Sequence, residues 1–460
     1  MIIGIPHACF TMSYEMTEEE QRCLWDLRLI DPRDEIKKIE DRKDPLFKGS
    51  FAWVLGCKEY KNFINWEGSN KHRLLWIKGD AGKGKTMLLL GIIRELERLN
   101  SNPDSPNLSY FFCQGTNSTL NTPTAVLRCL VWLVLVQQPS LISYVRDKYV
   151  TAGPNLFKDD NAFYVLRDAF KNMLKDTRLK RAFLIVDALD ECIDKDKPGL
   201  AQLLDFISTT VVTSPNIKWL VSSRNRPDIE SRLRDGEGRV RLDLELNSEC
   251  IRNAVDAYID HKLSELDRLK HYEEERVQIA QELRQKADGT FLWVALVCKE
   301  LESVESYDAL AVLGEMPSKL KDLYGRMMRQ IEELKRDDPK YCKRVLSTII
   351  LAYEPLHVSE LEILTALPKH VPLPDIIKKC ASFLTIRDDV VYPVHQSAKD
   401  YLTIDAESEI LPDGRAKGHV MILSQSLHAM SNTFRRGYLR LAGSRSFHRA
   451  YQLPQSRSSH

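Results

Sequence analysis

The stretch LLWIKGDAGKGKT, residues 74–86, decides the fold of this chain. Its first four residues are all apolar, which is the pattern of a strand buried in a parallel sheet. The last eight, residues 79–86, match G-x-x-x-x-G-K-[ST], and residues 87–99 then have the period of an amphipathic helix. Because a phosphate-binding loop works between a strand and a helix, the sequence predicts a phosphate site here rather than an ordinary glycine-rich turn.

Each residue type in this loop has a physical part in holding phosphate. Glycines let successive backbone N–H groups turn toward phosphate oxygens, and the helix N-terminus adds its positive end. We expect Lys85 to reach the β- and γ-phosphates and the hydroxyl of Thr86 to bind Mg²⁺. The predicted nucleotide-binding residues of the loop are Gly79, Asp80, Ala81, Gly82, Lys83, Gly84, Lys85 and Thr86.

A second apolar strand, residues 183–186, ends in the acidic sequence DALDE. Its first carboxylate, Asp187, is expected at the carboxyl edge of the sheet, where it can hold Mg²⁺. Asp190 or Glu191 could then position or deprotonate the attacking water. The alternative is that these acidic residues only cap a helix.

Two further residues are weaker candidates. Arg224 ends the segment WLVSSR (219–224), in which polar residues follow an apolar strand. It could stabilise the charge of a transferring γ-phosphate, or be a surface arginine. His395 closes a predicted hairpin, and a single histidine in such a place is more often structural than functional.

Strands and helices alternate through the first half of the chain. Further strands are predicted at 108–113, 183–186 and 219–221, and further helices at 125–136, 163–174 and 200–212. This alternation predicts a three-layer α/β domain with a parallel sheet. Residues 248–350 are predicted to be helical.

Residues 346–405 have the outline of a winged helix. Its predicted order is helix, helix, hairpin, helix. The first and last of these helices begin with Ser-x-x-acidic patterns at Ser359 and Ser397, and the turn of the hairpin is at residues 387–389. The second helix of this unit, about 374–380, offers only Lys378 and Lys379, so it lacks the basic polar face of a DNA-reading helix.

No acidic residue follows 413, and we expect the last 20 residues or so to be disordered.

Composition sets the class of protein. Hydrophobic residues make up 43% and charged residues 28%, which excludes a wholly disordered or collagen-like chain. The 66 Lys and Arg against 65 Asp and Glu give a net charge of +1, so no global field recruits nucleic acid or membrane. The ten cysteines contain no C-x-x-C pair, and no apolar run approaches the roughly 20 residues that span a bilayer. We expect an intracellular, cytoplasmic protein.

These motifs together carry a resemblance to a known family. The segments LLWIKGDAGKGKT, FLIVDALDEC (183–192), WLVSSRNRP (219–227), GTFLWVALV (289–297) and VHQSAKDYL (394–402) resemble the NACHT module of fungal NOD-like receptor proteins. These are signal-transduction ATPases with numerous domains, and they include heterokaryon-incompatibility proteins. The resemblance covers roughly residues 30–435.

The resemblance implies a role for each candidate residue. Lys85 and Thr86 match the Walker A residues, and Asp187 matches the Walker B aspartate. The pair Asp190 and Glu191 matches its acidic extension, Arg224 matches the sensor arginine, and His395 matches the winged-helix histidine that touches the β-phosphate of bound diphosphate. Members of the family usually carry an N-terminal effector domain and C-terminal repeats. In this sequence about 30 residues precede the module, and we expect no repeat array after it.

The sequence therefore predicts six segments. They are a short N-terminal segment (1–30), a helical lead-in (31–70), the NACHT P-loop NTPase domain (71–246), a helical domain (247–345), a winged-helix domain (346–435) and a basic tail (436–460).

Our leading hypothesis is a nucleotide switch with slow hydrolysis, using Mg²⁺ with ATP or GTP and holding ADP or GDP at rest. It would self-associate or pair with related NACHT proteins. The alternative is a non-enzymatic adaptor or decoy that holds nucleotide and pairs with longer relatives. A third hypothesis, a nucleic-acid motor, is disfavoured by the neutral charge.

Overall fold

The strands predicted from the sequence form one parallel sheet, with a fifth strand at its edge. In this computed structural model the strand order is β2–β3–β4–β1–β5, and all neighbouring strands are parallel. The strands are β1 (Leu74–Lys78), β2 (Asn107–Phe112), β3 (Ala182–Asp187), β4 (Ile217–Ser223) and β5 (Arg239–Asp243). Strand β5 was not predicted, because its charged and apolar residues alternate, as suits a partly exposed edge strand.

The chain divides into two compact units, Met1–Leu323 and Tyr324–His460, called the first and the second unit below. The structure describes residues 14–42, 46–67, 72–99, 102, 105–192, 198–233, 236, 238–266, 273–302, 304–305 and 307–442.

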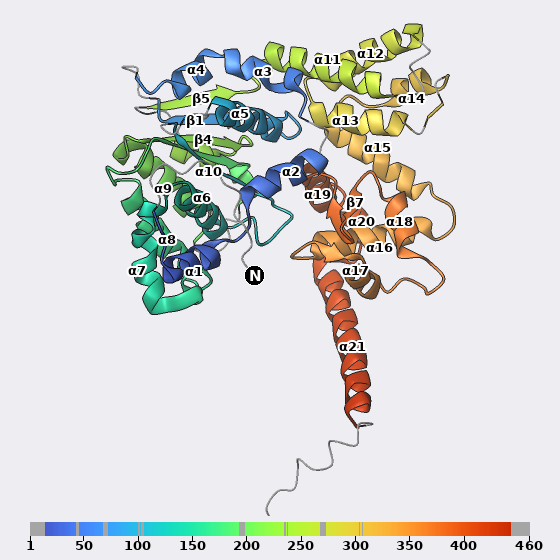
Figure 1. Ribbon diagram of the computed structural model, residues 1–460. Helices are drawn as coiled ribbons and strands as arrows, with labels where there is room; N and C mark the ends of the chain where they lie inside the picture. The colour runs from blue at the N-terminus through green and yellow to red at the C-terminus, as the bar shows by residue number, and fades with distance from the viewer. Residues whose placement is uncertain are drawn as a thin grey trace, which may run out of the picture. The chain divides into compact units, whose positions relative to one another are not determined.

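Helices lie on both sides of the sheet (Figure 1), so the predicted three-layer α/β architecture is confirmed. α5 packs against β3 and β4, α6 against β2, and α9 against β4. The helices of this part are α1 (Glu18–Leu27), α2 (Pro32–Arg42), α3 (Lys48–Gly56), α4 (Lys58–Ile64), α5 (Lys85–Leu99), α6 (Pro123–Gln137), α7 (Ser143–Ala152), α8 (Ala162–Met173), α9 (Leu200–Thr213) and α10 (Pro227–Leu233). Three short 3₁₀ helices are η1 (Pro139–Leu141), η2 (Gly153–Phe157) and η3 (Leu189–Glu191).

The central strands are buried along their whole length, which explains their continuous apolar sequences. The two tryptophans in the sheet are almost fully buried, and each indole N–H has a partner: Trp76 donates to Ser223 Oγ at 2.9 Å and Trp219 to Thr210 Oγ1 at 3.0 Å. In the pairing register, Phe112 lies opposite Asp187 and Lys78 opposite Ser223. The residues that follow β1, β3 and β4 therefore share one edge of the sheet.

A helical region completes the first unit. Its helices are α11 (Ser248–Glu265), α12 (Glu273–Ala287), α13 (Phe291–Leu301), α14 (Ala309–Glu315) and the start of α15 (Leu320–Glu332). The buried indole of Trp293 donates to Pro317 O at 2.8 Å and so ties α13 to the segment before α15. Between residues 247 and 323 the described residues contain no strand.

The second unit has the element order expected of a winged helix. After α15 it contains α16 (Asp338–Leu351), β6 (Leu356–His357), α17 (Val358–Thr365), α18 (Leu373–Lys379), β7 (Leu384–Arg387), β8 (Val390–Pro393), α19 (Gln396–Ile404), α20 (Glu407–Ile410) and α21 (Gly414–Ala442). The strands pair antiparallel in the order β6–β8–β7. Positive φ angles at Asp388 and Asp389, 48° and 59°, form the tight turn predicted between β7 and β8.

The predicted helix starts at Ser359 and Ser397 are corrected. The N-cap of α17 is His357, whose Nδ1 accepts from Ser359 N at 3.2 Å, and the N-cap of α19 is His395, whose Nδ1 accepts from Ser397 N at 3.1 Å. Imidazole Nδ1 serves as the acceptor that a serine hydroxyl usually supplies. Each serine is instead the second residue of its helix.

The structure also bears on the predicted segments. The predicted boundary between residues 345 and 346 falls inside α16, whereas the two compact units divide at Leu323 and Tyr324. Helix α21 continues to Ala442, past the predicted start of the tail at residue 436, and residues 443–460 lie outside the described residues. The other boundaries stay predictions.

Candidate nucleotide-binding site

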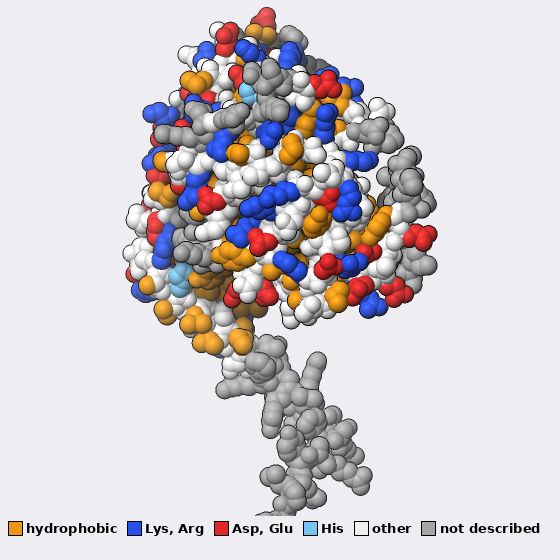
Figure 2. Space-filling view, turned by 90° about the vertical axis from the view of Figure 1, so that its left-hand side faces the viewer, with side chains coloured by type: hydrophobic (Ala, Val, Ile, Leu, Met, Phe, Trp, Pro, Cys, Tyr) orange, Lys and Arg blue, Asp and Glu red, His pale blue; other side chains and the backbone are white. Residues whose placement is uncertain are grey.

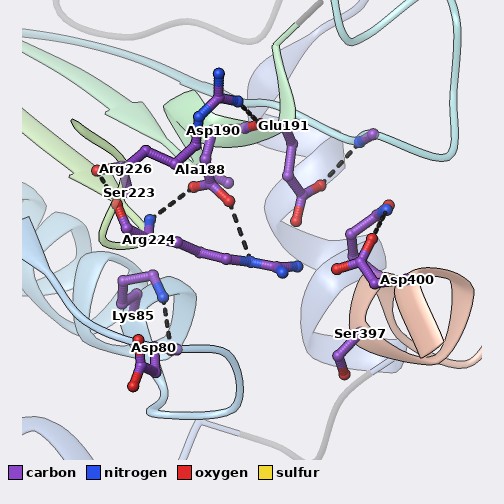
Figure 3. Close-up of polar contacts among 12 residues, drawn as sticks. Asp80, Lys85, Ala188, Asp190, Glu191, Ser223, Arg224, Arg226, Ser397 and Asp400 are labelled. Carbon is purple, nitrogen blue, oxygen red and sulfur yellow. Dashed lines mark hydrogen bonds and ion pairs between the residues drawn. The ribbon is translucent and has the colours of Figure 1, made fainter. Parts of the chain in front are cut away.

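The predicted phosphate-binding loop connects β1 to α5. Gly82 and Gly84 have φ angles of 79° and 81°, in the left-handed region that favours glycine. They alternate with residues of ordinary φ, the arrangement that turns successive N–H groups into one concavity. Lys85 begins α5 and folds back over the loop, donating from Nζ to Gly79 O at 2.6 Å and to Asp80 O at 2.8 Å (Figure 3).

Electrostatic interactions show that Lys85 shares its surroundings with three other predicted residues. Burial lowers the pKa of Lys85, the charges of Asp190 and Asp187 raise it, and the charge of Arg224 lowers it. The structure thus brings the loop lysine together with the residues that follow β3 and β4.

Asp187 is the last residue of β3 and is 2% exposed. β4 lies between β3 and β1, and its residue Ser222 donates from Oγ to Asp187 Oδ1 at 2.5 Å. The same hydroxyl accepts from Ala188 N at 2.8 Å, and Ala188 has a left-handed φ of 53°. Ser222 therefore fixes both the carboxylate and the sharp turn after it, a role that the sequence analysis missed.

The structure gives Asp190 and Glu191 different surroundings. Asp190 is engaged by Arg224, which donates from its backbone N to Oδ1 at 2.9 Å and lies with Nε 3.2 Å from Oδ2 (Figure 3). Arg226 donates to the Asp190 carbonyl at 3.1 Å. Asp190 thus orients the arginine proposed to face phosphate.

Glu191 accepts a backbone hydrogen bond from Gly115 N at 2.8 Å to Oε2. Burial raises the pKa of Glu191 to about 7, and the charges of Asp190 and Asp187 add to the rise, while Gly115 and Arg224 oppose it. A carboxylate that changes protonation near neutral pH suits a general base. Of the two acidic candidates, Glu191 is therefore the better placed to deprotonate water.

A segment at the start of α13 contacts the glycine loop, and the sequence analysis gave it no role. Lys83 donates from Nζ to Asp288 O at 2.9 Å and to Thr290 Oγ1 at 3.3 Å. Leu292 N donates to Gly82 O at 3.3 Å. A Cβ on Gly82 would lie 2.9 Å from Thr290 Cγ2, so close approach as well as φ requires glycine there. The motif GTFLW was the only feature of the sequence that pointed to this segment, and it did not indicate that the segment contacts the glycine loop.

A second group of residues contacts the loop at Asp80. Asp80 N donates to Glu245 Oε1 at 2.8 Å, and Asn225 Nδ2 donates to Asp80 Oδ1 at 3.1 Å. The sequence analysis missed both partners, because Glu245 follows the unpredicted strand β5 and Asn225 lies in the exposed turn after β4.

His395 belongs to the second unit and holds a structural position there. Besides accepting from Ser397 N, its Nδ1 lies 2.8 Å from Ser397 Oγ, and Ser397 Oγ lies 3.0 Å from the hydroxyl of Tyr324. Its assignment to bound diphosphate stays a prediction from the resemblance.

The donor set fits a nucleotide with Mg²⁺. Left-handed glycines, a helix N-terminus and a lysine suit phosphate oxygens, and Thr86 with Asp187 supplies the hydroxyl and carboxylate that Mg²⁺ takes when phosphates provide other ligands. Within the described ranges, no group of three or more His, Cys, Asp or Glu side chains is arranged to hold a metal ion without such help.

The parallel sheet and the glycine loop define the class of this protein, one with the P-loop NTPase fold. A family model described as Nephrocystin 3, N-terminal matches residues 49–224. Vegetative incompatibility protein HET-E-1 of Podospora anserina is 42% identical over 442 residues, which are 92% of this chain and 32% of that protein. The chain spans about a third of the length of this relative.

Two solved structures are similar to this chain at low sequence identity and low TM-score. A signal-transduction ATPase with numerous domains and a tetratricopeptide repeat sensor, from Pyrococcus horikoshii, is 15% identical with a TM-score of 0.38, covering 81% of this chain and 48% of that one. A Walker-type ATPase of Pyrococcus abyssi is 16% identical with a TM-score of 0.34, covering 72% of this chain and 91% of that one.

The resemblance predicted from the motifs is confirmed: over 442 residues this chain is similar to a fungal vegetative incompatibility protein. In the part of the chain that the structure describes, no helix combines the length and the apolar character that a membrane crossing requires. Basic and acidic side chains are interspersed over the face shown in Figure 2, in keeping with the net charge of +1.

Proposed function

We propose that this chain is a nucleoside-triphosphate-binding switch that hydrolyses its ligand slowly. The proposal rests on one observation. The glycine loop and its Lys85 lie at the same edge of the sheet as the residues that follow β3 and β4. A concave row of N–H groups binds phosphate, and nearby ionisable groups supply charge and proton transfer.

Each residue of the site has its own proposed role in hydrolysis. Lys85 would exchange its contacts with the loop carbonyls for phosphate oxygens, and Arg224, oriented by Asp190, would face the charge that develops on transfer. Glu191 would accept the proton of the attacking water. Thr86 and Asp187 would hold Mg²⁺, which when bound neutralises phosphate charge.

A switch further requires that diphosphate and triphosphate favour different conformations, because only differential affinity shifts an equilibrium. The loop residue Lys83 donates to Asp288 and Thr290, and Leu292 N donates to Gly82 O, so the helical region contacts the phosphate-binding loop directly. We propose that a change of phosphate state acts on the helical region through this connection. Assembly with a second copy or with a longer relative is the proposed output.

The test measures binding and turnover of ATP and GTP by the parent and by Glu191→Gln. The proposal expects both proteins to bind and only the parent to release phosphate. If turnover is absent in the parent while nucleotide stays bound, the non-enzymatic adaptor becomes the better description. Equal turnover in the two proteins would contradict Glu191 as the base.

A further inference from the structure

The loop after β2 makes two contacts of different kinds through consecutive residues. Gly115 N donates to Glu191 Oε2 at 2.8 Å, a bond drawn at Glu191 in Figure 3. The side-chain amide of Gln114 donates from Nε2 to Glu35 Oε1 at 2.7 Å, and Glu35 belongs to α2. We propose that Gln114 is a positioning residue for Glu191, and that Glu35 is the anchor that holds it.

The backbone couples these two contacts. The carbonyl of Gln114 and the N–H of Gly115 belong to one planar peptide unit, so fixing one fixes the direction of the other. The carbonyl accepts from Asn117 N at 2.9 Å, and Gln114 N donates to Leu120 O at 3.2 Å. Anchoring the side chain of Gln114 therefore restrains the N–H group that meets Glu191.

Glu35 is suited to act as an anchor. Its side chain is 4% exposed, and its Oε2 lies 3.5 Å from Lys38 Nζ. A hydrogen bond to a buried carboxylate is charge-assisted and stronger than one between neutral groups. Removing either partner also leaves a buried polar group without that bond.

The position of the Gly115 N–H matters because of what surrounds Glu191. Asp187 and Asp190 disfavour its ionised form, as burial does, while Arg224 and the Gly115 hydrogen bond favour it. The buried thiol of Cys113 is a further titratable neighbour of Glu191, and Cys192 follows Glu191 directly in the chain. Weakening the Gly115 bond should therefore raise the pKa of Glu191 and leave less of the basic form at neutral pH.

This inference rests on the proposed function, since it concerns the orientation of the proposed base. It also gives the helical lead-in a role that the motifs did not reveal. Through Glu35, helix α2 is connected to the hydrolytic carboxylate by two hydrogen bonds and one peptide unit.

The test compares Gln114→Met and Glu35→Met with the parent. Each variant should bind nucleotide as the parent does, and the acid limb of its phosphate-release profile should move to higher pH by about 0.5–1 unit. That shift lowers kcat roughly three- to tenfold on the acid side, and the loss disappears at high pH. The double variant should shift no further than either single one, because both act on the same bond.

Two variants separate positioning from a general loss of structure. Glu35→Gln keeps an acceptor oxygen for Gln114 and should restore a near-parental profile. Gln137→Met removes a glutamine that bonds Leu108 N and O, each at 2.8 Å, at the amino end of β2, away from the site edge. It should leave the acid limb where it is, even if the protein unfolds at a lower temperature.

A readout without nucleotide completes the test. The ¹³C carboxyl resonance of Glu191, identified by its absence in Glu191→Gln, should titrate at higher pH in Gln114→Met than in the parent. An unchanged titration and an unchanged acid limb would overturn the positioning role, as would an equal loss of kcat at every pH. Turnover retained in Glu191→Gln would instead overturn the proposed base, and the positioning role with it.

Discussion

At the scale of single residues, Asp190 and Glu191 are neighbours in the chain but have different partners in the structure. The spacing of the acidic residues after β3 left Asp190 and Glu191 interchangeable as candidates for handling water. The structure distinguishes them, because Asp190 lies against Arg224 while Glu191 meets the Gly115 N–H. Such partners come from distant parts of the chain, so no local pattern predicts them.

The raised pKa of Glu191 predicts a pH dependence in the accessible range. Below about pH 7 the carboxylate takes up a proton, so phosphate release should fall towards acidic pH, approaching tenfold per unit. A profile that stays flat from pH 8 down to pH 5.5 would contradict Glu191 as the base.

The same shift predicts an effect on stability. The folded state holds a proton on Glu191 that the unfolded state releases near the ordinary value of 4.5, so its contribution to stability falls as pH rises from about 4.5 to about 7. Glu191→Gln should therefore unfold at a higher temperature than the parent at pH 8 and show less advantage at pH 5. Thermal unfolding at the two pH values measures this, and equal gains at both would be inconsistent with a shifted carboxyl group.

The requirement for glycine in the phosphate loop can be tested by comparing an alanine substitution there with one at a glycine outside the loop. Gly84→Ala places a side chain on a backbone with φ of 81°, and its Cβ would lie 2.9 Å from Phe291 Cδ2. We expect a loss of about 1–2 kcal/mol in stability, together with weaker nucleotide binding. The control is Gly314→Ala in α14, where nothing lies within 4 Å of the new Cβ and unfolding should be unchanged or slightly delayed. Normal binding by Gly84→Ala would count against the loop as the phosphate site.

At the scale of elements, the sequence predicted the buried strands because continuous apolar runs have few other uses. It missed β5, whose alternating residues form the sheet edge, and it placed two helix starts at serines although histidines cap them. Histidine is not among the usual capping residues, so composition alone could not have indicated it. The helical lead-in and the start of α13 were predicted as helices, but their contacts with the site depend on the tertiary fold.

The cap of α19 gives a prediction at this scale. His395→Ala removes the acceptor for Ser397 N and should lower the free energy of unfolding by about 0.5–2 kcal/mol, while His395→Asn should recover most of it. Thermal unfolding of the three proteins measures the difference. If asparagine destabilises as much as alanine, the capping role is wrong. A nucleotide-binding defect that persists in the asparagine variant would support the additional role that the resemblance implies.

At the scale of the whole molecule, the order of the motifs was enough to predict a P-loop domain followed by helices and a winged-helix-like unit. The strand order could not be read from the sequence, because nothing local shows that β4 lies between β1 and β3. Nor could the sequence show that the chain divides inside α15, since periodicity continues through that helix.

Titration of ATP and GTP into the parent chain and into Lys85→Ala measures directly whether nucleotide binds at the loop after β1. Lys85 is the cation held over the loop, and its removal should leave the fold intact while taking away a charge that phosphate requires. We expect the parent to bind one of the nucleotides, and Lys85→Ala to bind it at least about tenfold more weakly. Equal affinity of the two proteins, with Lys85→Ala folded as the parent is, would contradict the account.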